Sequence, residues 1–241
     1  MKKTSRNPAF LFCILILFIH SCTSTDIGKT VGDAWNNRPL TEAEAGEGIK
    51  EALTIGISKG ADEVARTDGY FGNPLIRIPF PPQAMKVEKT LRDVGLGAEV
   101  DKVILSLNRA AEDAATEAKP IFINAIKQLT IRDALNIVRG ANDAATGYLK
   151  DKTSDQLTAA FKPKISASLD KVNATRYWTD IMNLYNKVPF VEPVNTDLTS
   201  YVTNKAIDGL FIKVAEEELR IRENPIARTT ELLKRVFGSK N

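Results

Sequence analysis

The sequence predicts an all-α protein whose mature part is a single multi-helix, bundle-like domain of about nine or ten helices. Three observations predict this class. Apolar residues recur at helical steps of three and four along most of the chain. Helix start signals stand before several of these stretches. No segment shows the sustained alternation of apolar and polar residues that is typical of half-buried strands.

The first 21 residues have the composition of an export signal. Lys2, Lys3 and Arg6 provide a basic start without any acid, and an apolar run follows from Ala9 to Ile19. That run is too short to cross a bilayer, which requires about 20 apolar residues. A basic start before an apolar run of this length is typical of a signal peptide. We therefore expect residues 1–21 to be a signal peptide.

A lipid attachment site is expected at Cys22. Ser21 directly before this cysteine resembles the lipobox of bacterial lipoproteins, although His20 departs from its usual pattern. The resemblance implies cleavage before Cys22 and acylation of its sulfur and its new amino group, which anchors the protein in a membrane. Thr23, instead of Asp, favours the outer membrane, facing the periplasm. An ordinary secretory signal or an uncleaved anchor are the alternatives.

Removing the signal changes what the composition allows. The single histidine is His20, and the two cysteines are Cys13 and Cys22. The mature domain therefore has no histidine and no thiol besides Cys22, which excludes Ser-His-Asp and Cys-His catalysis, zinc sites and disulfides. The signal also holds three of the 33 basic residues and none of the 30 acids, leaving 30 of each. We expect no cofactor, no metal site and no nucleic-acid partner.

Residues 22–42 lack helical periodicity and are expected to be a lipidated N-terminus and flexible tether, followed by the helical domain at 43–241. The first helix should begin near Thr41. Its buried face is predicted to hold Ile49, Leu53, Ile57, Gly60 and Val64. Gly56 and Gly60 beside this face indicate either a flexible hinge or a close crossing with another helix.

Two irregular loops with proline and phenylalanine interrupt the helical pattern, at Thr67–Pro82 and Lys187–Asn195. Thr130 with Asp133, and Thr153 with Gln156, resemble capping boxes at helix starts. Pro120 and Pro225 suit first-turn positions. Further helices are predicted at Pro82–Gly95, Ala98–Ala118, Pro120–Leu129, Thr130–Arg139, Asp143–Lys150, Thr153–Val172, Ala174–Lys187, Asp197–Arg222 and Pro225–Phe237.

Four blocks of sequence resemble a bacterial family known as domain of unknown function 4197. They are YFGNPLIRIPFP, SLNRAAEDAA with EAKPIF, IRDALNIVRG with DAATGYL, and YVTNKAIDGLF with AEEE. The blocks stand in order over roughly residues 43–238. The resemblance implies an exported, helical, envelope-associated protein, and it supplies no catalytic residues.

Two helices carry candidate polar sites. In the helix at 98–118, Arg109 and Asp113 lie opposite the apolar face at i, i+4 spacing, and Asn108 and Glu112 lie on one flank. They indicate either a polar site facing a cleft or a solvated surface with an ordinary ion pair.

In the helix at 197–222, Glu218 falls on the apolar face, with Arg222 one turn later. A buried acid is paired or has a raised pKa, and either state suits a functional acid or a structural ion pair. Glu216 and Glu217 are expected to face water.

The loop after the first helix supplies the binding candidates Tyr70, Phe71, Arg77 and Phe80. They indicate either a lid or partner-binding loop, or a loop fixed to the core by its aromatic residues. The leading hypothesis is a membrane-tethered, non-catalytic domain that binds an envelope protein or a small ligand. The alternatives are a carboxylate- and arginine-based, hydrolase-like enzyme, with or without Mg²⁺ or Ca²⁺, and a lipid carrier with an apolar cavity between helices.

Overall fold

The computed structural model describes residues 41–186, 197–224, 230 and 234–236, which all belong to one compact unit, Leu40–Asn241. The expected signal peptide, Cys22 and nearly all of the tether lie outside the described residues. The predicted second irregular loop, Lys187–Asn195, lies outside them too.

The described residues form eight α-helices and one 3₁₀ turn, without a strand, which confirms the all-α class. The number is lower than predicted because two expected helices are one and Pro225–Phe237 is described only at 230 and 234–236. The elements are α2 (Glu42–Val64), η1 (Pro82–Ala84), α3 (Met85–Asp93), α4 (Gly97–Ala115), α5 (Ala118–Lys127), α6 (Ile131–Arg139), α7 (Ala144–Lys171), α8 (Ala174–Tyr185) and α9 (Leu198–Glu223).

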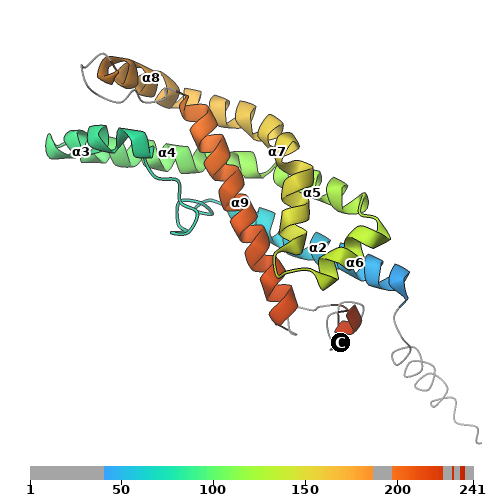
Figure 1. The fold of residues 1–241 in the computed structure, drawn as a ribbon. Helices are drawn as coiled ribbons and strands as arrows, with labels where there is room; N and C mark the ends of the chain where they lie inside the picture. Colours follow the sequence, from blue (N-terminus) through green and yellow to red (C-terminus); the bar gives the residue numbers. More distant parts are fainter. Residues whose placement is uncertain (1–40, 187–196, 225–229, 231–233, 237–241) are drawn as a thin grey trace, which may run out of the picture. The chain divides into compact units, whose positions relative to one another are not determined.

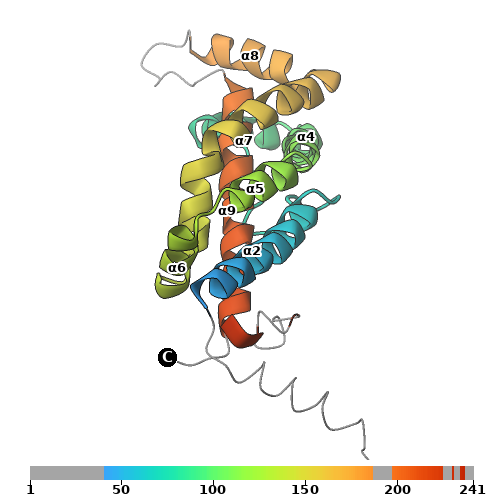
Figure 2. The same cartoon turned by 90° about the vertical axis from the view of Figure 1, so that its right-hand side faces the viewer.

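Helix α9 is, together with α7, one of the two long helices against which most of the others pack. It packs against α7, α2, α4 and α8, while α7 also packs against α4 and α5 (Figures 1 and 2). Phe211 of α9 meets Phe122 of α5 edge to face, with ring centroids 5.7 Å apart. The first and last long helices described, α2 and α9, are therefore neighbours in the core.

Helix α2 begins as the sequence predicts. Thr41 accepts a hydrogen bond from the Glu44 amide and Glu44 accepts one from the Thr41 amide, which closes a capping box. All residues of the predicted buried face are buried. A Cβ atom added to Gly60 would lie 3.5 Å from the Lys213 carbonyl oxygen of α9. The glycines therefore mark a close helix crossing.

Helix α7 corrects one prediction. The break expected between Lys150 and Thr153 is absent, and the second capping box does not form, because the Thr153 hydroxyl donates to the Leu149 carbonyl oxygen at 2.7 Å inside the helix. A buried row passes through the predicted break with four-residue spacing: Leu149, Thr153, Leu157, Phe161, Ile165 and Leu169. The capping box of Thr130 and Asp133 on α6 is confirmed.

Candidate functional site

Two polar side chains of α4 fix the long segment that follows α2. The Asn108 amide accepts a hydrogen bond from the Ile78 N–H and donates one to the Ile78 carbonyl, both at 2.8 Å. One turn later, Glu112 Oε1 accepts from the amides of Tyr70 and Phe71 at 3.1 and 3.2 Å. Both side chains are buried. We call Asn108 and Glu112 the loop anchor, and residues 66–80 the anchored segment.

Tyr70 inserts the anchored segment into the core. Its hydroxyl donates to the Ala206 carbonyl oxygen of α9 at 2.6 Å, and the residue is fully buried. Space for it comes from Gly209, where a Cβ atom would lie 2.8 Å from the Tyr70 ring. Burial, and then the negative charge of Glu112, raise the pKa of the Tyr70 hydroxyl far above its ordinary value. Tyr70 therefore stays protonated and structural.

Arg109 completes the anchor instead of pairing with Asp113. Its guanidinium donates to Glu112 Oε2 at 2.5 Å and to Asp68 Oδ1 at 2.7 Å, and hydrogen bonds to these two carboxylates raise its pKa. Asp113 instead accepts a hydrogen bond from Ser168 of α7 at 3.0 Å. The i, i+4 ion pair of Arg109 and Asp113 considered from the sequence is therefore wrong. Glu112 is a buried hydrogen-bond acceptor for the main chain of the anchored segment, with 4 % of its surface exposed.

The four binding-loop candidates divide into two pairs. Tyr70 and Phe80 are buried, and Phe80 meets Trp178 of α8 edge to face at 5.4 Å. Phe71 is half-buried and Arg77 is exposed, and the Arg77 guanidinium carbon lies 4.3 Å from the centre of the Phe71 ring. Only Phe71 and Arg77 can therefore meet another molecule without unfolding the segment.

Glu218 lies at the junction of three helices. Its carboxylate accepts hydrogen bonds from the Ala145 and Thr146 amides at 3.0 and 2.8 Å, and from the Thr146 hydroxyl at 2.8 Å. These amides belong to the first turn of α7, so Glu218 caps the positive end of that helix from outside. Arg222 donates to the same carboxylate at 2.8 Å and to the Ile137 carbonyl oxygen at 2.8 Å.

The pair therefore bridges two helix ends of opposite polarity. Arg222 binds the last carbonyls of α6, where the helix dipole is negative, while Glu218 binds the first amides of α7, where it is positive. This connection joins α6, α7 and α9. Every oxygen of the Glu218 carboxylate has a hydrogen-bond donor within the protein.

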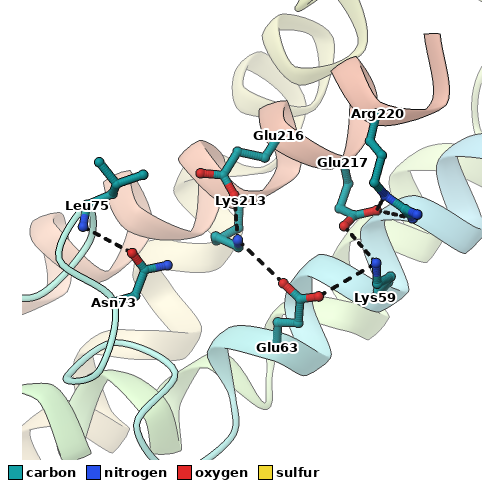
Figure 3. A network of polar contacts seen from close by, with 8 residues as sticks. All are labelled: Lys59, Glu63, Asn73, Leu75, Lys213, Glu216, Glu217 and Arg220. Atoms are coloured by element: carbon teal, nitrogen blue, oxygen red, sulfur yellow. Dashed lines mark hydrogen bonds and ion pairs between the residues drawn. The ribbon is translucent and has the colours of Figure 1, made fainter. Parts of the chain in front are cut away.

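The prediction that Glu217 faces water is wrong, because this side chain is buried. It is 6 % exposed and binds Lys59 of α2 at 3.2 Å and Arg220 at 2.5 Å. Figure 3 shows that these contacts continue through Glu63, which binds Lys59, and through Lys213 and Glu216. The prediction for Glu216 agrees with its 40 % exposed side chain. Alternating charges therefore line the crossing of α2 and α9.

The sequence placed Asn108 beside Glu112 on one flank of the helix, but it did not predict the partner of either side chain. The signal for this flank was present, because Asn108 and Glu112 are one turn apart beside a strongly apolar face. Their partners lie 30 and about 42 residues earlier in the chain. Helical periodicity therefore identifies the flank that they share but not the loop that covers it.

An open groove on α7 has a volume of about 670 Å³. Lys162 and Asp197 face each other across part of it at 3.9 Å. Pro163, which lines the groove, has no N–H to donate to the carbonyl of Ala159. The described ranges contain no cluster of three or more His, Cys, Asp or Glu residues able to hold a metal ion. None of the described helices is both long and apolar enough to span a membrane.

The fold and these contacts define an all-α domain in which buried carboxylates bind main-chain groups of other elements. The chain belongs to the family described as protein of unknown function (DUF4197), whose model matches residues 39–238. This match confirms the resemblance of the four sequence blocks. No curated protein and no solved structure matches the chain.

Proposed function

We propose that this chain is a lipid-anchored protein of the bacterial cell envelope whose helical domain binds a partner protein or a small ligand and does not catalyse a reaction. Residues 1–22 support the anchor through their basic start, apolar run and terminal cysteine. The outer membrane, facing the periplasm, is the proposed location. The acyl groups on Cys22 would supply the contact with the membrane.

The use of the buried acids carries the non-catalytic part of the proposal. A general acid or base must come within hydrogen-bond reach of the proton that it transfers. Glu112 binds two amides and Arg109, and Glu218 binds two amides, a hydroxyl and Arg222. Glu217 binds Lys59 and Arg220. The carboxylate of each acid is therefore already bound to groups of the protein itself, and these bonds hold elements of the fold together.

The carrier alternative has weaker support. An apolar depression beside Glu218, lined by Ile49, Leu53 and Ile221, has a volume of about 20 Å³. That is close to the smallest cavity able to hold one water molecule. The groove on α7 is open to solvent and has Asp155, Lys162 and Asp197 in its lining, so it does not enclose an acyl chain.

Crosslinking with mass spectrometry in native envelopes tests the proposal. A lysine-reactive crosslinker should join the helical domain of the full-length chain to the same envelope protein in repeated preparations. The Cys22→Ala variant should lose these links if anchoring places the domain beside its partner. Links confined to the chain itself, together with turnover of a substrate by the purified wild-type domain, would contradict a binding function and favour the enzyme.

A further inference from the structure

We infer that the outer side of the anchored segment recognises an acidic segment of another protein, with Arg77 binding a carboxylate and Leu75 contacting a neighbouring apolar side chain. This inference rests on the proposed binding function and specifies its surface. Tyr70 and Phe80 are excluded from that surface by burial. Phe71, Leu75 and Arg77 remain, and we call them the recognition surface.

The recognition surface is held in place before any partner arrives. The residues on both sides of it are fastened, because Tyr70 binds Glu112 and Ala206 while Ile78 binds Asn108. Between them, Ile76 is buried against Gly209, and the Leu75 amide donates to Asn73 Oδ1 at 3.0 Å (Figure 3). A loop that is already ordered before binding loses little conformational entropy when a partner binds, so its affinity for the partner is higher.

Leu75 and Arg77 are presented differently from ordinary surface residues. Leu75 is 70 % exposed, the largest exposed fraction among the large apolar residues described. The guanidinium carbon of Arg77 lies 4.3 Å from the centre of the Phe71 ring, a cation–π contact that favours this position of the side chain. Arginine is enriched among the residues that contribute most to binding at protein interfaces, and phenylalanine is enriched at interfaces in general.

The guanidinium of Arg77 can bind a carboxylate of another molecule, whereas the guanidinium of Arg109 is already paired with two carboxylates of this chain. Arg109 also lies near Phe71, 5.9 Å from the ring centre, but it binds Asp68 and Glu112. Within the described part of the chain, no carboxylate forms an ion pair with Arg77. A planar guanidinium that stacks through its face keeps its N–H edge for a carboxylate, which it binds through two parallel hydrogen bonds.

An acidic protein segment fits this surface better than a lipid headgroup layer. Binding to an anionic membrane surface depends on clusters of about four to eight lysines and arginines. The anchored segment has only Arg66 and Arg77, and Asp68 opposes them. One ordered arginine beside one exposed leucine instead matches a single carboxylate next to an apolar side chain.

Site-specific photocrosslinking tests the inference. The photoreactive residue p-benzoylphenylalanine replaces Leu75 in the full-length chain in cells, and replaces Val94, which is 65 % exposed at the turn between α3 and α4, as a control. The adduct formed at position 75 should contain a peptide with Asp or Glu close to the crosslinked residue. Arg77→Glu should lower its yield about tenfold or more, as expected for an interface hot spot.

Matched variants separate recognition from general charge and from folding. Arg66→Glu alters charge equally in the same segment, at an exposed arginine without a stacking ring, and should leave the yield within about twofold. Arg77→Lys keeps the charge but loses the planar fork, so it should also lower the yield. Replacing the mapped acid of the partner by Lys should restore the adduct with Arg77→Glu. All variants should keep the wild-type melting temperature.

The outcomes distinguish this inference from the proposed function. A partner adduct at position 94 but not at 75 would overturn the recognition surface and leave a binding function standing. An adduct at position 75 that is insensitive to Arg77→Glu, or that contains only lipid, would overturn the role of Arg77 in recognising a protein carboxylate. Adducts at neither position, with no protein crosslinks from lysines elsewhere on the domain, would overturn both.

Discussion

At the scale of single residues, Glu218 has more partners than its position on an apolar helix face indicates. The sequence predicts a buried acid with Arg222 as its nearest cation, and the structure has this pair. The amides of Ala145 and Thr146 are the partners that sequence reasoning missed. They lie 72 and 73 residues away, so only the packing of α7 against α9 brings them to Glu218.

Glu218→Gln should therefore lower the free energy of unfolding by about 3–5 kcal/mol, as for other broken buried ion pairs. The glutamine amide group would face amide donors of α7, and Arg222 would lose its counter-charge. A urea melt measures the loss. Glu216→Gln, at a half-exposed acid on the same helix, should cost at most about 1 kcal/mol.

A second neutral replacement refines this experiment. Arg222→Gln added to Glu218→Gln should recover part of the loss, because no unpaired charge remains. Recovery will be incomplete because Arg222 also binds the carbonyls of Ile137 and Val138. A loss below about 1 kcal/mol for the single variant, without coupling to Arg222, would show that this junction is not a stabilising site.

Tyr70 should make the protein sensitive to alkaline pH. An unfolded tyrosine loses its proton near pH 10, whereas burial keeps the folded hydroxyl protonated well above that value. This contribution to stability is complete below about pH 10 and is lost as the pH rises further. Tyr201, whose pKa is raised to about 12, acts in the same direction.

Tyr70→Phe should therefore reduce the difference between the free energies of unfolding at about pH 8 and about pH 11. At the lower pH it should cost about 1 kcal/mol for the lost hydrogen bond to Ala206. Urea melts at both values measure the effect. Tyr177→Phe, at an exposed tyrosine, is the control and should leave the difference unchanged. An equal alkaline loss in the Tyr70 variant would rule out this mechanism.

At the scale of elements, helices were more predictable from sequence than the contacts between them. The face of α2 was predicted correctly because Ile49, Ile57 and Val64 follow the helical period. The false break in α7 came from reading Thr153 as a cap, although the four-residue row from Leu149 to Leu169 continues past it. The attachment of the anchored segment depends on α4 and α9 together, which no local pattern encodes.

Two glycine substitutions test how the elements approach one another. A Cβ atom at Gly209 would lie 2.8 Å from the Tyr70 ring and 3.1 Å from Ile76 Cβ, so Gly209→Ala should displace the anchored segment and cost about 1–3 kcal/mol. A Cβ atom at Gly60 has 3.5 Å to its nearest neighbour. Gly60→Ala should therefore be neutral or stabilise the helix by up to about 1 kcal/mol.

Thermal melts of the two alanine variants measure the contrast, and proteolysis of the anchored segment adds a local readout. Faster cleavage within residues 66–80 is expected only for Gly209→Ala. Equal stability of both variants would mean that the approach of Tyr70 to α9 is not tightly constrained. A large loss for Gly60→Ala would instead show that the crossing of α2 and α9 tolerates no added methyl group.

At the scale of the whole molecule, the anchor remains a prediction from residues 1–22. Cys22→Ala should abolish incorporation of a labelled fatty acid, because no other cysteine follows the signal. Metabolic labelling followed by purification of the chain measures this. Wild-type labelling of the variant would show that the lipobox interpretation is wrong, and Cys13→Ala provides a control that should be acylated normally.

Composition also predicts how the domain responds to reagents. Because the sequence beyond Cys22 contains no cysteine or histidine, neither dithiothreitol nor a zinc chelator should change its melting temperature. A shift of several degrees with either reagent would reveal a disulfide between chains or a metal site built from other ligands. Differential scanning calorimetry with and without each reagent distinguishes these cases.

The position of α9 has a consequence for how the chain acquires its structure. Its partners α2, α4, α7 and α8 are synthesised first, and their common core surface is incomplete until residues 198–223 follow. Pairing of distant segments raises contact order and slows folding. Completion of the core therefore requires residues 198–223, and until they pack the unfinished apolar faces of the earlier helices stay exposed to aggregation and to chaperones.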